Sequence, residues 1–458
     1  MAENIVKEYE LSAVTNEYSE LIGFASPNGK KSYILDSRGT SHGAALNHAA
    51  AHAAMNIGAM QSRFGSTAIA ACCGDSITAN AFETVSTYSA YKNVNFYAQA
   101  AACAGVFPTL TPFALGGYTT ALWIRDYLQP ALISGAKVAF ILLGINDIHV
   151  AGVATSVTKA NLTTIYSAFI NAGIYVVALS ILPDATDATE SGKVYEINQW
   201  IASYWATNGA RGEYQNVNPV VANQAGTNTT YKTNYDIGDG IHPSNLGVHA
   251  IGAALTACFA RLFSPYALVS SNNDSRTVNS ASRNLTLNPM MLGNVAGLAT
   301  GFISGGDSGV TITPTVGTAN GGIGQKQILT VSTTSGGTKS GFLLSADCIA
   351  NAVAGHILQA GARIKLVSQT NLKRLGLYWS ASGGATAASG WFNLESGTPV
   401  AFDWQTQEWL VARTAPFMLS TGSTSLRAGL FYEFDTSGTG AAVIEIEQLE
   451  LIDTSLAN

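Results

Sequence analysis

Between residues 66 and 222, short apolar runs alternate with longer stretches in which apolar residues recur at helical spacing. The runs have few polar interruptions, which is typical of strands buried on both faces of a parallel sheet. We expect strands at 66–73, 93–101, 137–143, 174–182 and 216–222. We expect crossover helices at 121–135, 157–171, 190–206 and 245–262. The pattern predicts an α/β fold with a parallel sheet between two layers of helices.

The pattern changes on both sides of this α/β domain, which we place at residues 66–265. Residues 1–65 form a leader whose segment 44–64, rich in Ala and Met, is predicted to be a helix that serves packing, oligomerisation or attachment. Residues 266–285 are polar and rich in Ser and Asn, as in a linker. From 286 to 458, short β-type runs recur between Gly, Ser and Thr turns, which predicts an all-β jelly-roll or sandwich domain.

The composition narrows the class of protein. Only 11% of the residues are charged, against about 25% in an average globular chain, which fits either a subunit buried in an assembly or a β-rich extracellular protein. The net charge is −6 and no Lys/Arg cluster occurs, so we expect neither nucleic acid nor anionic lipid as a partner. No apolar run reaches the length of a membrane span, and the acidic start lacks the features of a secretion signal.

The cysteines and two of the histidines do not point to a metal site. Five cysteines without C-x-x-C spacing are expected to be buried free thiols, although a bridge from Cys72 or Cys73 to Cys103 stays open. His48 and His52 are four residues apart, but neither a carboxylate nor a third histidine accompanies them. We therefore expect no metal there.

Two segments place reactive groups where predicted strands end. Gly74-Asp75-Ser76 follows the first strand, so Ser76 lies at the edge of the sheet where α/β proteins bind ligands. Asn146 follows the strand at 137–143 and has an amide suited to stabilising an oxyanion. Each segment also has an ordinary explanation, as a helix cap or as a turn.

A third segment, Asp239-Gly240-Ile241-His242-Pro243, precedes the last predicted helix. A neutral imidazole can take the proton of a serine, and a carboxylate three residues away can orient that imidazole. A solvated loop is the ordinary alternative. Together the three segments supply a nucleophile, a base with its orienting carboxylate, and an oxyanion donor, in the residue types that ester hydrolysis requires.

The order and wording of these segments resemble the SGNH/GDSL hydrolase family over about 200 of the 458 residues. The resemblance implies a three-layer, flavodoxin-like domain and a serine esterase with Ser76, His242 and Asp239 as catalytic residues and no cofactor. It also implies an oxyanion hole formed by Ser76, Asn146 and a glycine. That glycine is Gly117 or, as the reserve, Gly116, in a block that departs from the family pattern because Tyr118 replaces its acidic residue.

Two residues beside these blocks are weaker candidates for substrate binding. Tyr118 follows Gly117 and Trp123 lies nearby, and either can form an apolar wall for a substrate or pack in the core. His149 lies three residues after Asn146, where it can line the site or be an ordinary loop histidine.

The C-terminal domain loosely resembles jelly-roll carbohydrate-binding modules. Its tryptophans can stack on sugars or pack in a core, and a sandwich can equally serve trimerisation; they are Trp379, Trp391, Trp404 and Trp409. The combination resembles a phage tail fibre or tailspike that deacylates a bacterial surface polysaccharide, with a bacterial extracellular carbohydrate acetylesterase as the competing setting. A non-catalytic, glycan-binding adhesin or virion subunit is the alternative function.

Overall fold

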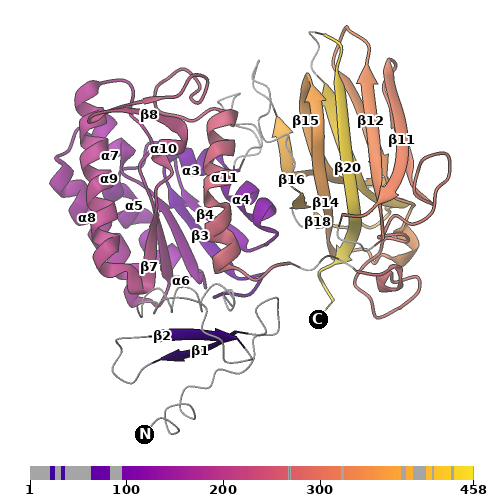
Figure 1. Cartoon of the computed structure of the whole chain (residues 1–458), viewed down its shortest axis with the longest axis horizontal. Coiled ribbons are helices and arrows are strands. Elements are labelled where there is room, and N and C mark those ends of the chain that lie inside the picture. The colour runs from indigo at the N-terminus through magenta and orange to yellow at the C-terminus, as the bar shows by residue number, and fades with distance from the viewer. Residues whose placement is uncertain are drawn as a thin grey trace, which may run out of the picture. The chain divides into compact units, whose positions relative to one another are not determined.

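The computed structural model describes residues 21–25, 32–36, 63–82, 95–266, 268, 270–320, 324–382, 388–395, 409–414, 417–434 and 438–456 (Figure 1). It divides into two units, Met1–Arg63 and Phe64–Asn458. In the first unit, strand β1 (Leu21–Ala25) pairs antiparallel with β2 (Ser32–Asp36). The helix expected over 44–64 lies outside the described residues except for its last two positions.

The second unit begins with a five-stranded parallel sheet, which confirms the predicted α/β fold. Its strands are β3 (Ile69–Gly74), β4 (Thr109–Ala114), β5 (Val138–Leu142), β6 (Tyr175–Leu179) and β7 (Gly212–Gln215). They lie in the order β4-β3-β5-β6-β7, and every neighbouring pair is parallel. In chain order this is the 2-1-3-4-5 arrangement of flavodoxin-like sheets, which reverses direction at β3.

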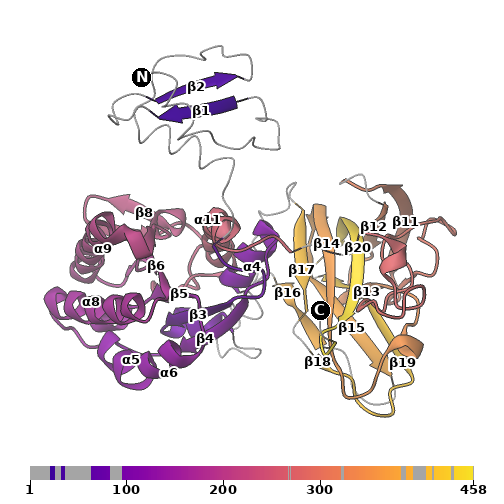
Figure 2. The ribbon, with the colours of Figure 1, turned by 90° about the horizontal axis from the view of Figure 1, so that it is seen from below.

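Helices cover both faces of this sheet (Figure 2). One group comprises α5 (Thr120–Asp126), α6 (Leu128–Ile133), α8 (Thr155–Asn171) and α9 (Ala188–Asn208). The other comprises α4 (Phe96–Ala104), α10 (Asn218–Val221) and α11 (Asn245–Leu262). Short elements complete the domain: helices α3 (Ser76–Asn80) and α7 (Ile145–His149), a 3-10 turn (Gly209–Arg211), and the hairpin of β8 (Ala222–Ala225) and β9 (Asn228–Tyr231). The three predicted layers are therefore present.

Two predicted strands were wrong. The segment 93–101 contributes to helix α4, because the Asn95 side chain caps the N–H groups of Tyr97 and Ala98 and starts a helix in place of a strand. The second strand of the sheet is instead β4, in a stretch where no strand was predicted. At 216–222 the strand β7 has already ended at Gln215, and Pro219 occupies the first turn of α10.

The chain enters and leaves the α/β domain at adjacent points. The backbone N–H of Phe64 donates to the carbonyl oxygen of Leu262 at 3.0 Å, and that of Ser264 donates to the carbonyl of Phe64 at 2.9 Å. The Phe64 and Phe263 rings lie 6.2 Å apart. The first and last residues of the domain are thus held together directly.

The C-terminal region consists of two antiparallel sheets, which confirms the predicted all-β class (Figure 1). One sheet has the order β10 (Ile303–Gly306), β13 (Lys339–Leu344), β19 (Ser425–Phe434), β15 (Leu372–Ser382) and β16 (Ala388–Glu395). The other has the order β11 (Val310–Thr318), β12 (Gln325–Thr333), β20 (Ala441–Asp453), β14 (Ile357–Thr370) and β17 (Leu410–Arg413), and β18 (Phe417–Met418) pairs with β14. Side chains of both sheets, such as Leu343 and Ile444, form one buried core.

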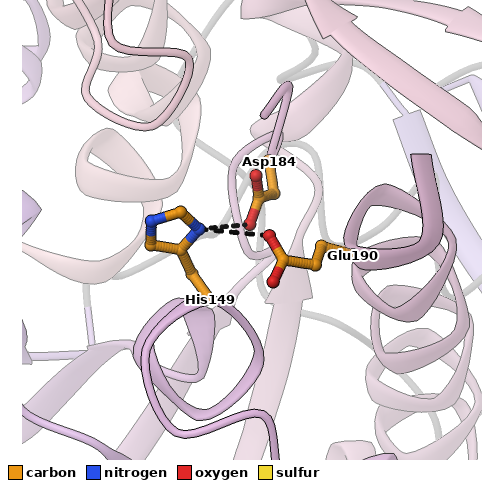
Figure 3. A group of neighbouring side chains, drawn as sticks. All are labelled: His149, Asp184 and Glu190. Carbon is orange, nitrogen blue, oxygen red and sulfur yellow. Dashed lines mark hydrogen bonds and ion pairs between the residues drawn. The ribbon is translucent and has the colours of Figure 1, made fainter. Parts of the chain in front are cut away.

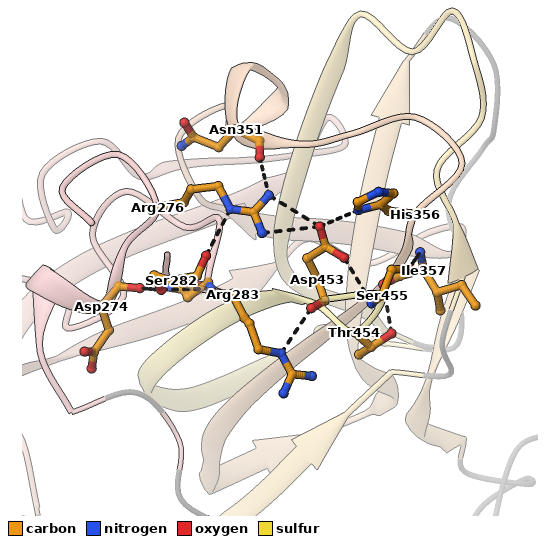
Figure 4. Close-up of polar contacts among 11 residues, drawn as sticks. Asp274, Arg276, Ser282, Arg283, Asn351, His356, Ile357, Asp453, Thr454 and Ser455 are labelled. Atoms are coloured by element: carbon orange, nitrogen blue, oxygen red, sulfur yellow. Dashed lines mark hydrogen bonds and ion pairs between the residues drawn. The ribbon is translucent and has the colours of Figure 1, made fainter. Parts of the chain in front are cut away.

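Part of the segment expected to be a linker is fastened to the sandwich (Figure 4). Arg276 donates to the carboxylate of Asp453 at 3.3 Å and to the carbonyl of Asn351 at 2.8 Å. His356 lies 2.8 Å from the same Asp453 oxygen. Asp453 is fully buried, and the guanidinium of Arg276 balances its charge.

Two further expectations can be compared with the described residues. All five cysteines are free thiols, and four of them are buried. Among the described helices, α11 is long and apolar enough by length and composition to cross a membrane. Its apolar residues Ile251, Leu255 and Phe259 are buried in the α/β core, as in a core helix of a globular domain.

Candidate active site

The candidate residues gather where strands β3, β4 and β5 end. Ser76 follows β3, the loop with Gly116 and Gly117 follows β4, and Asn146 follows β5. The loop with Asp239 and His242 precedes α11 and reaches the same edge. The site thus lies where the strand order of the parallel sheet reverses, which is where such sheets generally bind ligands.

The local sequence forces a sharp turn that presents Ser76. Asp75 caps helix α3, its Oδ1 accepting the N–H of Ile77 at 3.1 Å, so Ser76 becomes the first helical residue. Gly74 is required before it, because a Cβ atom there would lie 2.1 Å from Thr78 Oγ1 and 3.0 Å from the carbonyl of Leu142. The helix cap expected as an ordinary explanation is present, and it positions the serine.

Ser76, His242 and Asp239 form a continuous chain of contacts. Ser76 Oγ lies 2.8 Å from His242 Nε2, and His242 Nδ1 lies 2.6 Å from Asp239 Oδ2. A carboxylate can only accept, so Nδ1 carries the proton and a neutral imidazole leaves Nε2 free to accept from the serine. This is the tautomer that a general base acting on Ser76 requires.

Asp239 is itself held in place by the backbone. Its Oδ1 accepts the N–H groups of Ile241 and His242, each at 2.9 Å, while Oδ2 faces the imidazole. Burial lowers the pKa of His242, because desolvation disfavours the imidazolium form. The imidazole is therefore neutral, and able to accept a proton, at neutral pH.

The glycine loop lies next to the serine, and Asn146 contacts this loop. Asn146 is buried and uses one hydrogen of its Nδ2 amide to donate to the Tyr118 carbonyl at 3.1 Å. An amide nitrogen has two hydrogens, so the second is the candidate oxyanion donor. Gly117 has a left-handed φ of +78°, and a Cβ atom placed on Gly116 would lie 3.9 Å from Ser76 Cβ. Both glycines are exposed, and Gly116 approaches the serine side chain.

A buried carboxylate that the sequence analysis did not single out supports this loop. Asp147 accepts the backbone N–H of Thr120 at 2.8 Å and its hydroxyl at 2.5 Å. Burial raises the pKa of Asp147, and the bonds to Thr120 oppose that shift. The contact ties the start of α5 to α7. It thereby holds the loop that contains Gly117 against the helix that carries Asn146. Its signal was the acidic residue directly after Asn146.

The two weaker candidates are engaged in other contacts. The Tyr118 hydroxyl donates to Asp126 at 2.8 Å, and its ring packs 5.5 Å from that of Tyr127. His149 Nδ1 lies 3.1 Å from Glu190 Oε2 and 3.2 Å from Asp184 Oδ2. Trp123 is fully buried, so of the two alternatives stated for it the core position is the one observed.

Two of the four tryptophans in the sandwich have side chains that the structure describes. Trp379 is buried and stacks on Phe417 with ring centroids 3.5 Å apart, so it belongs to the core. Trp409 lies 5.2 Å beneath the guanidinium of Arg363. The side chains of Trp391 and Trp404 lie outside the described part of the structure.

Residues 72–250 match the GDSL-like Lipase/Acylhydrolase family. This range contains Ser76, Asn146, Asp239 and His242. No curated protein sequence matches the chain.

Solved structures resemble the α/β part of the chain. A lipase/acylhydrolase from Enterococcus faecalis is 18% identical, with 44% of this chain and 100% of that chain covered and a TM-score of 0.36. A GDSL-like lipase from Bacteroides thetaiotaomicron is 16% identical, with 45% and 95% covered and a TM-score of 0.34. A carbohydrate esterase family 3 protein from Talaromyces cellulolyticus is 16% identical, with 42% and 97% covered and a TM-score of 0.33.

Proposed function

We propose that the protein is a serine esterase in which Ser76 is the nucleophile, His242 the general base and Asp239 the residue that orients His242. The observation that carries the proposal is the unbroken chain Ser76 Oγ–His242 Nε2 at 2.8 Å and His242 Nδ1–Asp239 Oδ2 at 2.6 Å. The family match over residues 72–250 supports the same reaction class.

In the proposed mechanism, Ser76 Oγ attacks an ester carbonyl while its proton moves to His242 Nε2. The imidazolium that forms is stabilised by Asp239, and it then gives its proton to the leaving alcohol. Water attacks the acyl-enzyme with His242 again as base, which releases the acid and regenerates Ser76. Each step uses side chains already in contact, and the reaction needs no cofactor.

The oxyanion of the tetrahedral intermediate would be stabilised by three donors. These are the backbone N–H groups of Ser76 and Gly117 and the side-chain amide of Asn146. Ser76 is the first residue of α3, so its N–H is not used within that helix. Such donors act strongly because they are fixed before the negative charge develops.

The substrate we propose is an O-acyl group, in particular an O-acetyl group, on a polysaccharide. The site is open: Asp239, Gly116 and Gly117 are exposed, and Ser76 is only half-buried. A site with exposed residues at the edge of the sheet lets a long polymer lie across it, and a small acyl group needs little enclosure. The C-terminal sandwich would contribute glycan binding, in an extracellular or virion-associated protein such as a tail fibre that acts on a bacterial surface.

A non-catalytic adhesin or virion subunit on the same scaffold is the second candidate function. It shares the exposed edge of the sheet and the β-sandwich, but it has no need of the His242 tautomer that Asp239 enforces. The geometry around Ser76 therefore favours the enzyme.

The test is hydrolysis of p-nitrophenyl acetate, butyrate and octanoate by the wild type and Ser76→Ala. We expect rapid acetate turnover that falls steeply with chain length and is lost in Ser76→Ala. The matched control is Ser203→Ala, which changes an exposed serine on helix α9. Binding of an acetylated glycan without release of acetate from it would instead support the adhesin.

A further inference from the structure

A second group of functional side chains lies beside the proposed esterase site and takes no part in it. His149 at the end of α7, Asp184 in the loop after β6 and Glu190 in the first turn of α9 point toward one another (Figure 3). Their ligating atoms all lie within 4.8 Å of one another. They come from three separate elements, so the fold itself brings them together.

The group has more acceptor oxygens than protons. His149 Nδ1, which carries at most one hydrogen, has Glu190 Oε2 at 3.1 Å, Asp184 Oδ2 at 3.2 Å and Thr186 Oγ1 at 3.4 Å around it. Thr186 also has one proton, and it faces Asp184 Oδ1 at 2.5 Å and Glu190 Oε2 at 3.1 Å. The Thr186 N–H is a third donor, and it donates to Asp184 Oδ1 at 3.1 Å, so the four oxygens of two carboxylates share three donors.

Asp184 supplies an independent sign that an atom belongs between these groups. Its side chain is fully buried, yet Oδ2 accepts no hydrogen bond from any described residue although it is directed at His149. A buried carboxylate oxygen without a donor is costly. The buried Asp453 of the sandwich differs, because Arg276 and His356 both face its carboxylate.

We propose that His149, Asp184 and Glu190 bind a divalent transition-metal ion, with zinc as the best-matched metal. One imidazole nitrogen and two carboxylate oxygens are a donor set that zinc accepts. Bonds of about 2.1 Å at the tetrahedral angle place ligand atoms roughly 3.4 Å apart. The two distances from His149 Nδ1, 3.1 and 3.2 Å, lie within about 0.3 Å of this spacing.

The ion would brace the loops of the esterase site and leave the ester chemistry to Ser76. His149 ends the same short helix that carries Asn146. The Asp184 loop contacts the loop of the general base, since the N–H of Ala185 donates to the carbonyl of Gly240 at 2.9 Å. A metal at this point therefore crosslinks the oxyanion side of the site to the His242 side.

The experiment measures zinc binding by the metal-stripped full chain. Equilibrium dialysis with elemental analysis gives the number of ions bound, and isothermal titration gives the affinity. The background variant is H48A/H52A, because those two histidines of the leader offer a second set of nitrogen ligands. We expect one equivalent of zinc and a raised melting temperature in this background. Asp184→Asn, Glu190→Gln and His149→Ala should each weaken binding at least tenfold.

Two control variants separate this site from other parts of the protein. His356→Ala removes a histidine that also faces a buried carboxylate, and it should bind zinc as the background does. Ser76→Ala should do the same, so the result is independent of whether the protein is an esterase. The proposal is rejected if zinc does not bind, if the three variants bind it unchanged, or if only calcium binds.

Discussion

The carboxylate of Asp239 contacts both the imidazole and the backbone N–H of His242. Oδ2 lies 2.6 Å from Nδ1, while Oδ1 accepts the N–H of the same histidine at 2.9 Å. Asp239→Asn keeps an oxygen for the backbone bonds, but it replaces the negative acceptor by an amide. The preferred tautomer of His242 then reverses, and we expect kcat for p-nitrophenyl acetate to fall by about 1,000- to 10,000-fold.

The control for this variant is Asp236→Asn, whose carboxylate accepts the N–H groups of Gly238 and Gly240 in the same loop. It should retain most of the activity. Near-normal turnover in Asp239→Asn would show that Asp239 does not orient the base.

The pH dependence of kcat/KM should follow His242. Burial lowers the pKa of this imidazole below its ordinary value of 6.5, and the neutral form is the one that accepts the serine proton. Activity should therefore rise with pH along one titration curve whose midpoint lies below 6.5, and it should be constant at neutral pH. Steady-state rates from pH 4.5 to 8 measure this curve, and a midpoint above 7 would contradict the assignment.

Gly74→Ala should destabilise the α/β domain. The added Cβ would meet Thr78 Oγ1 at 2.1 Å and the backbone carbonyl of Leu142 at 3.0 Å, and a backbone atom cannot rotate away. We expect a loss of about 1 to 3 kcal/mol in the free energy of unfolding, measured by urea denaturation.

Gly192→Ala is the matched comparison, since Gly192 lies within helix α9 with no atom within 4 Å of an added Cβ. This variant should be more stable than the wild type by roughly 0.5 to 1 kcal/mol. Equal effects of the two substitutions would argue against the tight turn at Ser76.

Asp75 should make the folded state more stable in mild acid. Burial raises its pKa to about 7 from the ordinary 3.8, so between these values the folded protein holds a proton that the unfolded chain has released. Stability relative to Asp75→Asn should then fall as pH rises from about 4 to about 7, by up to about 1.4 kcal/mol per pH unit. Above pH 7 the difference should be constant.

Urea denaturation of both proteins at several pH values from 4.5 to 8 tests this expectation. The asparagine keeps an oxygen for the cap on Ile77, so the comparison isolates the titration. A difference that does not change with pH would mean that Asp75 titrates alike in the folded and unfolded chains.

Most of the site was predictable because each of its segments directly follows or precedes a regular element. Ser76 and Asn146 end buried strands, and the parallel arrangement of those strands brings their ends together. The helix α4 was mistaken for a strand because Phe96 through Ala102 are all buried. A helix with no exposed face has no helical period in its sequence, and its type is then decided by the cap at Asn95.

The group of His149, Asp184 and Glu190 was beyond sequence reasoning for a different reason. His149 and Glu190 are 41 residues apart, on elements whose separation depends on how α7 and α9 pack against the sheet. No motif spacing encodes that distance. His149 was noticed only because it lies near Asn146 in the chain. Its partners Asp184 and Glu190 come after strand β6 in the sequence.

The hydrogen bonds of Phe64 with Leu262 and Ser264 hold the two ends of the α/β domain together. The chain therefore enters and leaves this domain at neighbouring points, as it does at the two ends of a loop. Adjacent chain ends of this kind are what the insertion of a domain into another chain, or its circular permutation, requires.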